Sequence, residues 1–106
     1  MEIKFEENDG VLVARLSELS DWKLFESIAN EITHEFDGSW IKKLDGLDQR
    51  YWDVKINDCE LTLHLEHYLG IMLFPTSKTS KLKDENELVK RIADYLAKTK
   101  LDEEAS

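Results

Sequence analysis

Residues 50–75 read RYWDVKINDCELTLHLEHYLGIMLFP, and this stretch decides the fold because it predicts three consecutive antiparallel strands. Apolar and polar side chains alternate over residues 51–56 and again over residues 59–66, which is the period of two expected of half-buried strands. Asn57 and Asp58 separate the two runs, and both residue types tolerate the backbone angles of a two-residue turn. The first two strands are therefore predicted to form a hairpin.

A two-residue turn fixes the register of this hairpin. It places Trp52 opposite Leu63 on one face of the sheet and Tyr51 opposite His64 on the other. A shift of one residue would set apolar side chains against polar ones, so the pattern itself favours this register. We expect the Trp52 face to bury the core and the Tyr51 face to be wetter.

The third strand, residues 71–74, is apolar on both faces. A glycine-containing reversal is predicted over residues 68–70, and a three-residue turn places Met72 and Phe74 on the same side as His64. A strand that is apolar on both faces is usually covered on both sides or has one face against a partner.

The segment before this stretch predicts another hairpin and a helix. Alternation over residues 3–16 is interrupted by Asn-Asp-Gly at residues 8–10, a strong signal for a tight turn. Apolar side chains then recur at helical spacing over residues 22–32, and Ser20 is the expected N-cap. The helix should end near Phe36, because Asp-Gly follows.

One further strand and one further helix complete the chain. Residues 40–44 predict a short strand, and a four-residue loop over residues 45–48 aligns Ile41 with Trp52. The second helix is predicted over residues 84–96, from an apolar stripe preceded by an Asp-x-x-Glu pattern that resembles a capping box.

Together these segments predict an α+β fold with the element order ββ-α-ββββ-α. We expect one antiparallel sheet with the two helices packed on its Trp52 face. The first hairpin either extends this sheet or folds over one of its edges. Residues 1–101 are predicted to form a single domain, and residues 102–106 an acidic C-terminal tail.

Composition and charge limit the classes of function. The chain has 106 residues, 42% of them hydrophobic, which is typical of an ordinary globular domain. Its net charge of −9 repels phosphate backbones, so we expect no direct binding of nucleic acid and consider a basic protein partner instead. No apolar run has membrane-spanning length, so no membrane partner is expected, and the single cysteine favours a cytoplasmic location.

The sequence offers little for catalysis or for a cofactor. The four glycines fall in separate predicted turns rather than in a phosphate-binding loop, and Cys59 is predicted on the opposite face from His64. We therefore expect no enzyme, no cofactor and no metal. An alternative is a metal or small-ligand site centred on His64 and Glu66, against a histidine that merely hydrogen-bonds Tyr51 on a polar sheet face.

The candidate binding surface is the wetter face of the sheet, where apolar residues stand in place of the expected polar ones. It comprises Tyr51, His64, Glu66, Met72 and Phe74. Aromatic residues and methionine are enriched at the centres of protein interfaces. The competing interpretation is that residues 76–83 fold back over this face and simply bury it.

Residues 48–70, which include Tyr-Trp-Asp and Leu-His-Leu-Glu-His-Tyr, resemble a family of short gammaproteobacterial proteins known as domain of unknown function 3630. Glu66, His67 and Gly70 chiefly carry the resemblance. It implies a bacterial cytoplasmic protein of about this length, and it implies no activity.

The sequence therefore predicts a small acidic protein that acts by binding another protein. The partner is either a second copy, in a homodimer, or a basic protein, as for an immunity or inhibitor protein. For a basic partner, the carboxylates expected to face it include Asp45, Asp48, Glu60 and Glu66.

Overall fold

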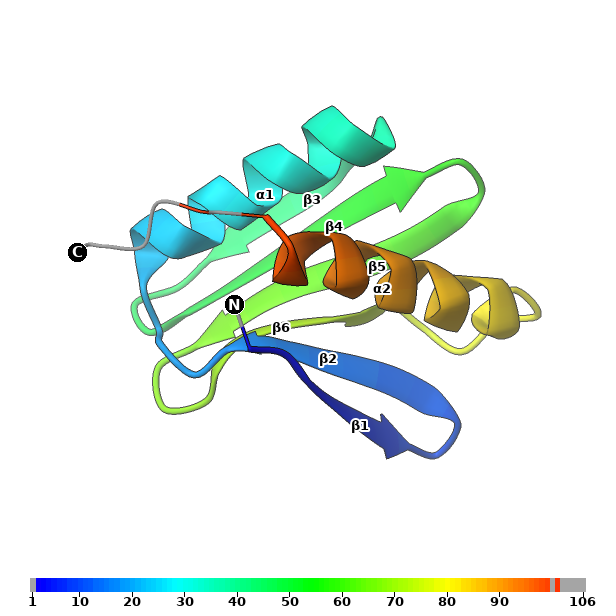
Figure 1. The fold of residues 1–106 in the computed structure, drawn as a ribbon, viewed down its shortest axis with the longest axis horizontal. Coiled ribbons are helices and arrows are strands. Elements are labelled where there is room, and N and C mark those ends of the chain that lie inside the picture. The colour runs from blue at the N-terminus through cyan, green and yellow to red at the C-terminus, as the bar shows by residue number, and fades with distance from the viewer. Residues whose placement is uncertain (1, 100, 102–106) are drawn as a thin grey trace.

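The computed structural model describes residues 2–99 and 101, which form a six-stranded antiparallel sheet and two helices (Figure 1). The order ββ-α-ββββ-α and the placement of both helices on one face confirm the predicted α+β fold. The predicted acidic tail, residues 102–106, lies outside the described residues. The elements are β1 (Lys4–Asn8), β2 (Val11–Ser17), α1 (Trp22–Phe36), β3 (Ser39–Asp45), β4 (Gln49–Ile56), β5 (Cys59–Glu66), β6 (Gly70–Pro75) and α2 (Leu82–Ala97).

The N-terminal hairpin extends the sheet rather than folding over an edge. The strand order is β1-β2-β6-β5-β4-β3, so β2 joins the end of the four-stranded meander by pairing with β6. Ala14 of β2 lies opposite Leu73 of β6, and both side chains are fully buried in the core. The hairpin therefore contributes to the same core as the meander.

The predicted register of the central hairpin is confirmed. Trp52 lies opposite Leu63 and Tyr51 lies opposite His64, as a two-residue turn requires. Asn57 adopts the left-handed conformation, with φ of 55°, in that turn. Alternation and the two-residue turn together fix this register, because a slip of one residue would bury polar side chains.

The β5–β6 turn determines which side chains of β6 face each side of the sheet. The turn occupies residues 67–69, one position earlier than predicted, and a shift of this kind leaves every side chain on the same face. Met72 consequently lies opposite His64. Gly70 has φ of 97°, and a Cβ there would lie 2.0 Å from the Ser17 carbonyl oxygen, so this position requires glycine.

The predicted register of β3 is wrong. Lys43, rather than Ile41, lies opposite Trp52, and a bulge between Trp40 and Lys42 displaces Ile41 to an exposed position. The error arises because Asp45 belongs to the strand instead of the turn, so the whole loop begins one residue later.

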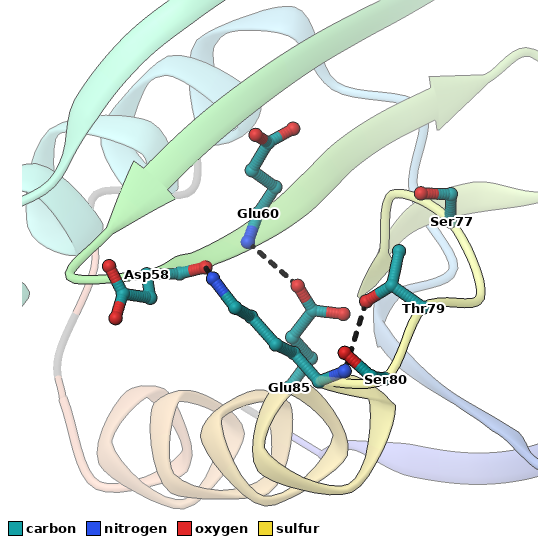
Figure 2. A pocket seen from close by; sticks show the side chains of 7 residues that line it. Asp58, Glu60, Ser77, Thr79, Ser80 and Glu85 are labelled. Carbon is teal, nitrogen blue, oxygen red and sulfur yellow. Dashed lines mark hydrogen bonds between the residues drawn. The ribbon is translucent and has the colours of Figure 1, made fainter.

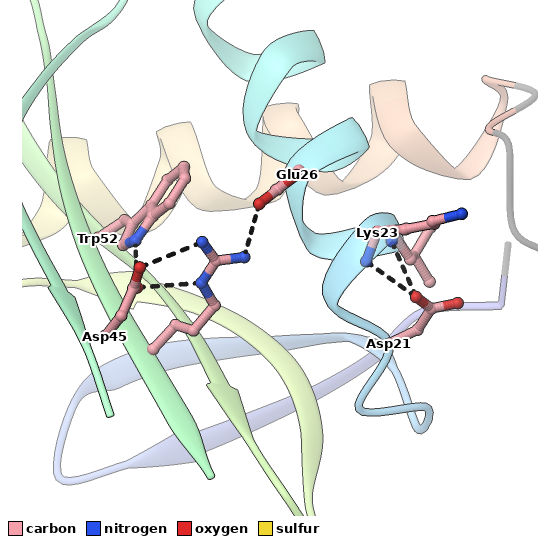
Figure 3. Close-up of polar contacts among 7 residues, drawn as sticks. Asp21, Lys23, Glu26, Asp45 and Trp52 are labelled. Carbon is pink, nitrogen blue, oxygen red and sulfur yellow. Dashed lines mark hydrogen bonds and ion pairs between the residues drawn. The ribbon is translucent and has the colours of Figure 1, made fainter. Parts of the chain in front are cut away.

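The helix N-caps also differ from those predicted. Asp21, rather than Ser20, caps α1, and its carboxylate accepts hydrogen bonds from the backbone N–H groups of Lys23 and Leu24 (Figure 3). Ser20 instead donates its hydroxyl hydrogen bond to the carbonyl of Glu66. Neighbouring Ser and Asp are both good N-caps, so residue type alone could not choose between them.

The second helix begins earlier than its capping-box pattern indicated. Its N-cap is Lys81 and its first residue is Leu82, so Asp84 lies within the first turn and is not the cap. A carboxylate in the first turn is favoured by the helix dipole, which explains the acidic residues there without a capping box.

The core lies between the two helices and the Trp52 face of the sheet. Phe25 of α1, Leu63 of β5 and Ile92 of α2 are fully buried within it. The ring of Phe25 meets Trp52 edge-on, with centroids 5.0 Å apart. Among the residues described, neither helix combines the length and apolar composition needed to cross a bilayer.

Candidate functional site

The face of the sheet opposite α1 and α2 is the candidate binding surface. Within residues 2–99 and 101, no helix covers it, and we call it the helix-free face. It is built by the side chains that alternate with core residues along the six strands: Lys4, Glu6, Asn8, Val11, Val13, Arg15, Ser39, Lys42, Leu44, Gln49, Tyr51, Asp53, Lys55, Glu60, Thr62, His64, Glu66, Met72 and Phe74.

The five side chains predicted as the binding surface lie together at the centre of this face. The ring of Tyr51 stacks on that of His64, with centroids 4.0 Å apart and planes 19° apart. His64 in turn meets the ring of Phe74 edge-on at 6.1 Å. Met72 lies opposite His64 on β6, and Glu66 lies two residues along β5. The result is a continuous aromatic and apolar strip across three strands.

Exposure divides this strip into a buried layer and an accessible layer. His64 and Met72 are buried, whereas Tyr51 is 37% exposed and Phe74 is half-buried. Leu44 of β3 lies opposite Tyr51 and is 53% exposed, which adds an apolar side chain at the margin. Leu44 is not among the predicted surface residues, although alternation along the strand from Ile41 places it on this face.

Both ring nitrogens of His64 are already engaged. Nδ1 lies 3.0 Å from the carbonyl oxygen of Arg50, and Nε2 lies 3.0 Å from Oε1 of Glu66. The expected hydrogen bond between His64 and Tyr51 is wrong, because the two rings stack and the Tyr51 hydroxyl instead donates to Gln49. Neither nitrogen of His64 has a lone pair directed at an open position.

The described residues hold no group of three or more His, Cys, Asp or Glu side chains that could bind a metal ion. His67 lies in the β5–β6 turn and packs against Tyr68. The geometry around His64 and Glu66 therefore gives the metal-site alternative no support.

The segment between β6 and α2 does not extend over the helix-free face. Thr76 reaches the edge of the face, where its hydroxyl lies 3.0 Å from that of Thr62. Residues 77–81 are exposed and lead to the N-terminus of α2, on the other side of the sheet (Figure 1). The strip is thus covered only by its own outermost side chains.

A second cluster of unusual side chains lies on the core face around Arg50, which is only 5% exposed. Its Nε and Nη2 donate to the two carboxylate oxygens of Asp45 at 3.0 and 3.2 Å, and its Nη1 donates to Glu26 at 3.1 Å. Asp45 also accepts from the indole N–H of Trp52 at 2.8 Å (Figure 3). This bidentate pair connects β3 to β4, and Glu26 connects both to α1.

Three aromatic rings surround the same guanidinium. Its central carbon lies 4.4 Å from the ring centre of Trp22, 4.9 Å from Phe25 and 4.6 Å from Trp52. Every side-chain nitrogen of Arg50 is hydrogen-bonded and its faces are covered, so it is equipped to hold elements together rather than to bind a ligand. The sequence predicted Trp52 on the core face, but it did not predict the buried arginine beside it.

Electrostatics within this cluster favour the charged forms. Hydrogen bonding from Arg50 holds the pKa of Asp45 below its ordinary value. Burial lowers the pKa of Arg50, but hydrogen bonds to Asp45 and Glu26 more than offset this, so its pKa is raised. The pair is therefore ionised at neutral pH.

The single thiol lies away from the helix-free face. Cys59 is partly buried against the core, where burial and then the nearby carboxylate of Glu85 raise the pKa of its thiol. A raised thiol pKa favours the unreactive protonated form.

Comparison with known proteins gives a family and no activity. The model of a family described as "Protein of unknown function (DUF3630)" matches residues 1–96, which include both hairpins and nearly all of α2. No curated protein matches the chain, and no solved structure matches it.

Proposed function

The chain belongs to the DUF3630 family of proteins of unknown function, and we propose that it is a non-catalytic interaction module that pairs with a second copy of itself through the helix-free face. The observation that carries this proposal is the stacked strip of Tyr51, His64 and Phe74, bordered by the exposed Leu44. A bacterial cytoplasmic location belongs to the same proposal, supported by the lone cysteine and the family resemblance.

The apolar content of this face supports protein binding. Leu44 and Tyr51 lie side by side and remain partly accessible, as does Phe74 on the other side of His64, whereas the face of an antiparallel sheet that meets only water is normally polar. Two such sheets can pack face to face, about 10 Å apart, with their side chains interdigitated. Pairing through the strip would remove these three side chains from water.

The charge distribution favours a second copy over a basic protein at this face. Its acidic and basic side chains are equal in number: Glu6, Asp53, Glu60 and Glu66 against Lys4, Arg15, Lys42 and Lys55. The whole chain has 23 acidic and 14 basic residues, so the acidic excess lies elsewhere. Two like-charged copies approach at least cost through a neutral surface.

The carboxylates considered for a basic partner are only partly free to serve one. Asp45 is occupied by Arg50 and Trp52, and Glu66 by His64. Asp48 and Glu60 remain. Asp48 directly precedes β4 and Glu60 is the second residue of β5, so they lie at opposite ends of the β4–β5 hairpin. A basic partner is the competing proposal. Salt should weaken binding to a basic partner, whereas it should strengthen the pairing of two like-charged copies.

Molar mass measured by light scattering tests the proposed surface. We expect the wild type to be a dimer and Leu44→Asp a monomer, because a carboxylate would have to be buried in the interface. The matched control is Leu47→Asp, which changes a leucine that is 97% exposed in the β3–β4 loop, and it should leave the dimer intact. Equal masses for the two variants would refute the assignment of this surface.

A further inference from the structure

A second candidate site, independent of the proposed pairing surface, lies where the β4–β5 turn meets the start of α2. A cavity of about 300 Å³ is bordered there by Asp58, Thr79, Ser80, Lys81 and Glu85, among others (Figure 2). The β6–α2 segment supplies hydroxyl groups to its wall, and the first turn of α2 supplies a carboxylate. The polar lining shows that this is not simply a gap in the apolar core.

The carboxylate of Glu85 is the unusual feature of the cavity. Glu85 is only 4% exposed although it lies in the first turn of a surface helix. Its Oε2 accepts a hydrogen bond from the backbone N–H of Glu60 at 3.0 Å. Because β6 ends at Pro75, this bond satisfies a strand N–H at the point where the neighbouring strand stops. One oxygen of Glu85 therefore has a structural role.

The other oxygen has no partner. Oε1 of Glu85 is buried and accepts no hydrogen bond from any residue that the structure describes. A carboxylate oxygen removed from water without a donor is costly, so its retention calls for a physical reason. Figure 2 shows this oxygen on the side of the carboxylate that faces Thr79 and Ser80, across the cavity.

The nearest basic side chain does not satisfy this oxygen. Nζ of Lys81 donates instead to the carbonyl oxygen of Asp58 at 3.2 Å, and the backbone N–H of Lys81 donates to the hydroxyl of Thr79 at 3.1 Å. The cavity thus presents an acceptor that lacks a donor, beside hydroxyl groups that can accept further hydrogen bonds.

We propose that this cavity binds an ammonium or guanidinium group, which donates an N–H hydrogen bond to Oε1 of Glu85. The charged side chains at its border are Asp58 and Glu85 against Lys81, because Glu60 contributes its backbone N–H while its carboxylate points away from the cavity, so an organic cation is favoured over an anion. A metal ion is a poorer fit, because the described residues form no metal-binding group. The group could belong to a free amine or to a lysine or arginine side chain of another protein.

The full-length ¹⁵N-labelled protein, titrated with ethylguanidinium chloride, provides the test. We expect saturable shifts at the amides of Glu60 and residues 82–86, and no such shifts with the neutral N-ethylurea or with sodium chloride at equal ionic strength. Titration with N-acetylarginine N-methylamide distinguishes the two sources. Tighter binding of this capped arginine than of ethylguanidinium indicates a protein side chain, and weaker binding indicates a free amine.

Two variants show whether Glu85 carries the binding. Glu85→Gln should weaken ethylguanidinium binding roughly tenfold or more, because it removes a hydrogen bond to a charged group. The matched control, Glu87→Gln, changes an exposed glutamate in the same helix and should bind as the wild type does. If Glu85→Gln fails to fold, Ser80→Trp fills the cavity from an exposed position and should abolish the shifts.

The proposal is overturned if ethylguanidinium gives only the shifts seen with sodium chloride. It is also overturned if folded Glu85→Gln binds as tightly as the wild type. Neither result would affect the pairing surface, because the cavity and Leu44 lie on different parts of the molecule.

Discussion

The two faces of this sheet bury charged and aromatic side chains in different ways. On the core face, Arg50 is enclosed by rings and carboxylates that its own chain supplies from α1, β3 and β4. On the helix-free face, His64 is equally buried, but Tyr51 and Phe74, which cover it, are themselves partly exposed. The first covering is enclosed by the fold, whereas the second leaves apolar side chains available to a partner.

The two faces should therefore respond differently to substitution. Changes on the core face should lower the free energy of unfolding and leave association unchanged. Changes to the exposed side chains of the helix-free face should weaken association and leave the free energy of unfolding nearly unchanged.

Removal of the buried guanidinium should have the largest effect. Arg50→Ala should lower the free energy of unfolding by about 3–5 kcal/mol, because it deletes a hydrogen-bonded ion pair and three ring contacts at once. Lys43→Ala is the control, since Lys43 also lies over Trp52, at 4.2 Å, but is exposed, and it should cost about 0.5 kcal/mol. Urea unfolding followed by tryptophan fluorescence measures both, and equal losses would show that the enclosure of Arg50 is unimportant.

The turn into β6 should be the next most sensitive position, because it sets which side chains reach each face. Gly70→Ala should lower the free energy of unfolding by about 2 kcal/mol or more, since its Cβ would collide with the Ser17 carbonyl at positive φ. Gly46→Ala meets no atom closer than 3.4 Å and should cost less than about 1 kcal/mol. A tolerated Gly70→Ala, measured by the same unfolding experiment, would mean that the turn can rearrange.

Lowering the pH should reduce the stability that Asp45 contributes to the cluster around Arg50. Its pKa in the folded protein lies below the ordinary value of 3.8, so its contribution is present above that pH and is lost as the pH falls through the folded pKa. The carboxylate is 44% exposed, so solvent screening limits the effect to less than about 1 kcal/mol. Urea midpoints between pH 5 and 3 should therefore fall less in Asp45→Asn than in the wild type, and parallel profiles would contradict this assignment.

Variants of the exposed strip should have the smallest effect on stability. Leu44→Asp should change the free energy of unfolding by no more than about 0.5 kcal/mol when monomeric protein is measured, because the side chain already contacts water. The unfolding experiment should be run at low protein concentration, since loss of a dimer would otherwise lower the apparent stability. A loss as large as that expected for Arg50→Ala would place Leu44 in the core and remove the distinction between the two faces.

The sequence was most informative where local pattern and turn chemistry acted together. The whole β4–β5 register followed from alternation and from the turn at Asn57, because a slip of one residue would have exchanged the two faces. The β3 register did not follow, because residue types alone do not show that Asp45 ends the strand instead of beginning the turn, and nothing in them signals the bulge at Ile41. The ion pair between Asp45 of β3 and Arg50 also involves Glu26 of α1, which is distant in the sequence, so local pattern could not predict it.

The candidate sites divide in the same way. The five residues of the strip were predicted from the alternation along β4, β5 and β6, since a three-residue turn that is misplaced by one residue leaves every side chain on the same face. Glu85 could not be singled out, because in the sequence it is one of three acidic residues between positions 84 and 87. Only the packing of α2 against the start of β5 shows that Glu85 is buried while Glu87 is exposed.

The most direct test of the central claim is the molar mass of the wild-type protein in solution, measured by light scattering over a range of concentrations at low and at moderate salt. Pairing through a charge-balanced face of a chain with net charge −9 predicts a dimer that becomes tighter as salt screens the remaining repulsion. A monomer at every concentration and salt level would contradict the account and would direct attention to a basic partner.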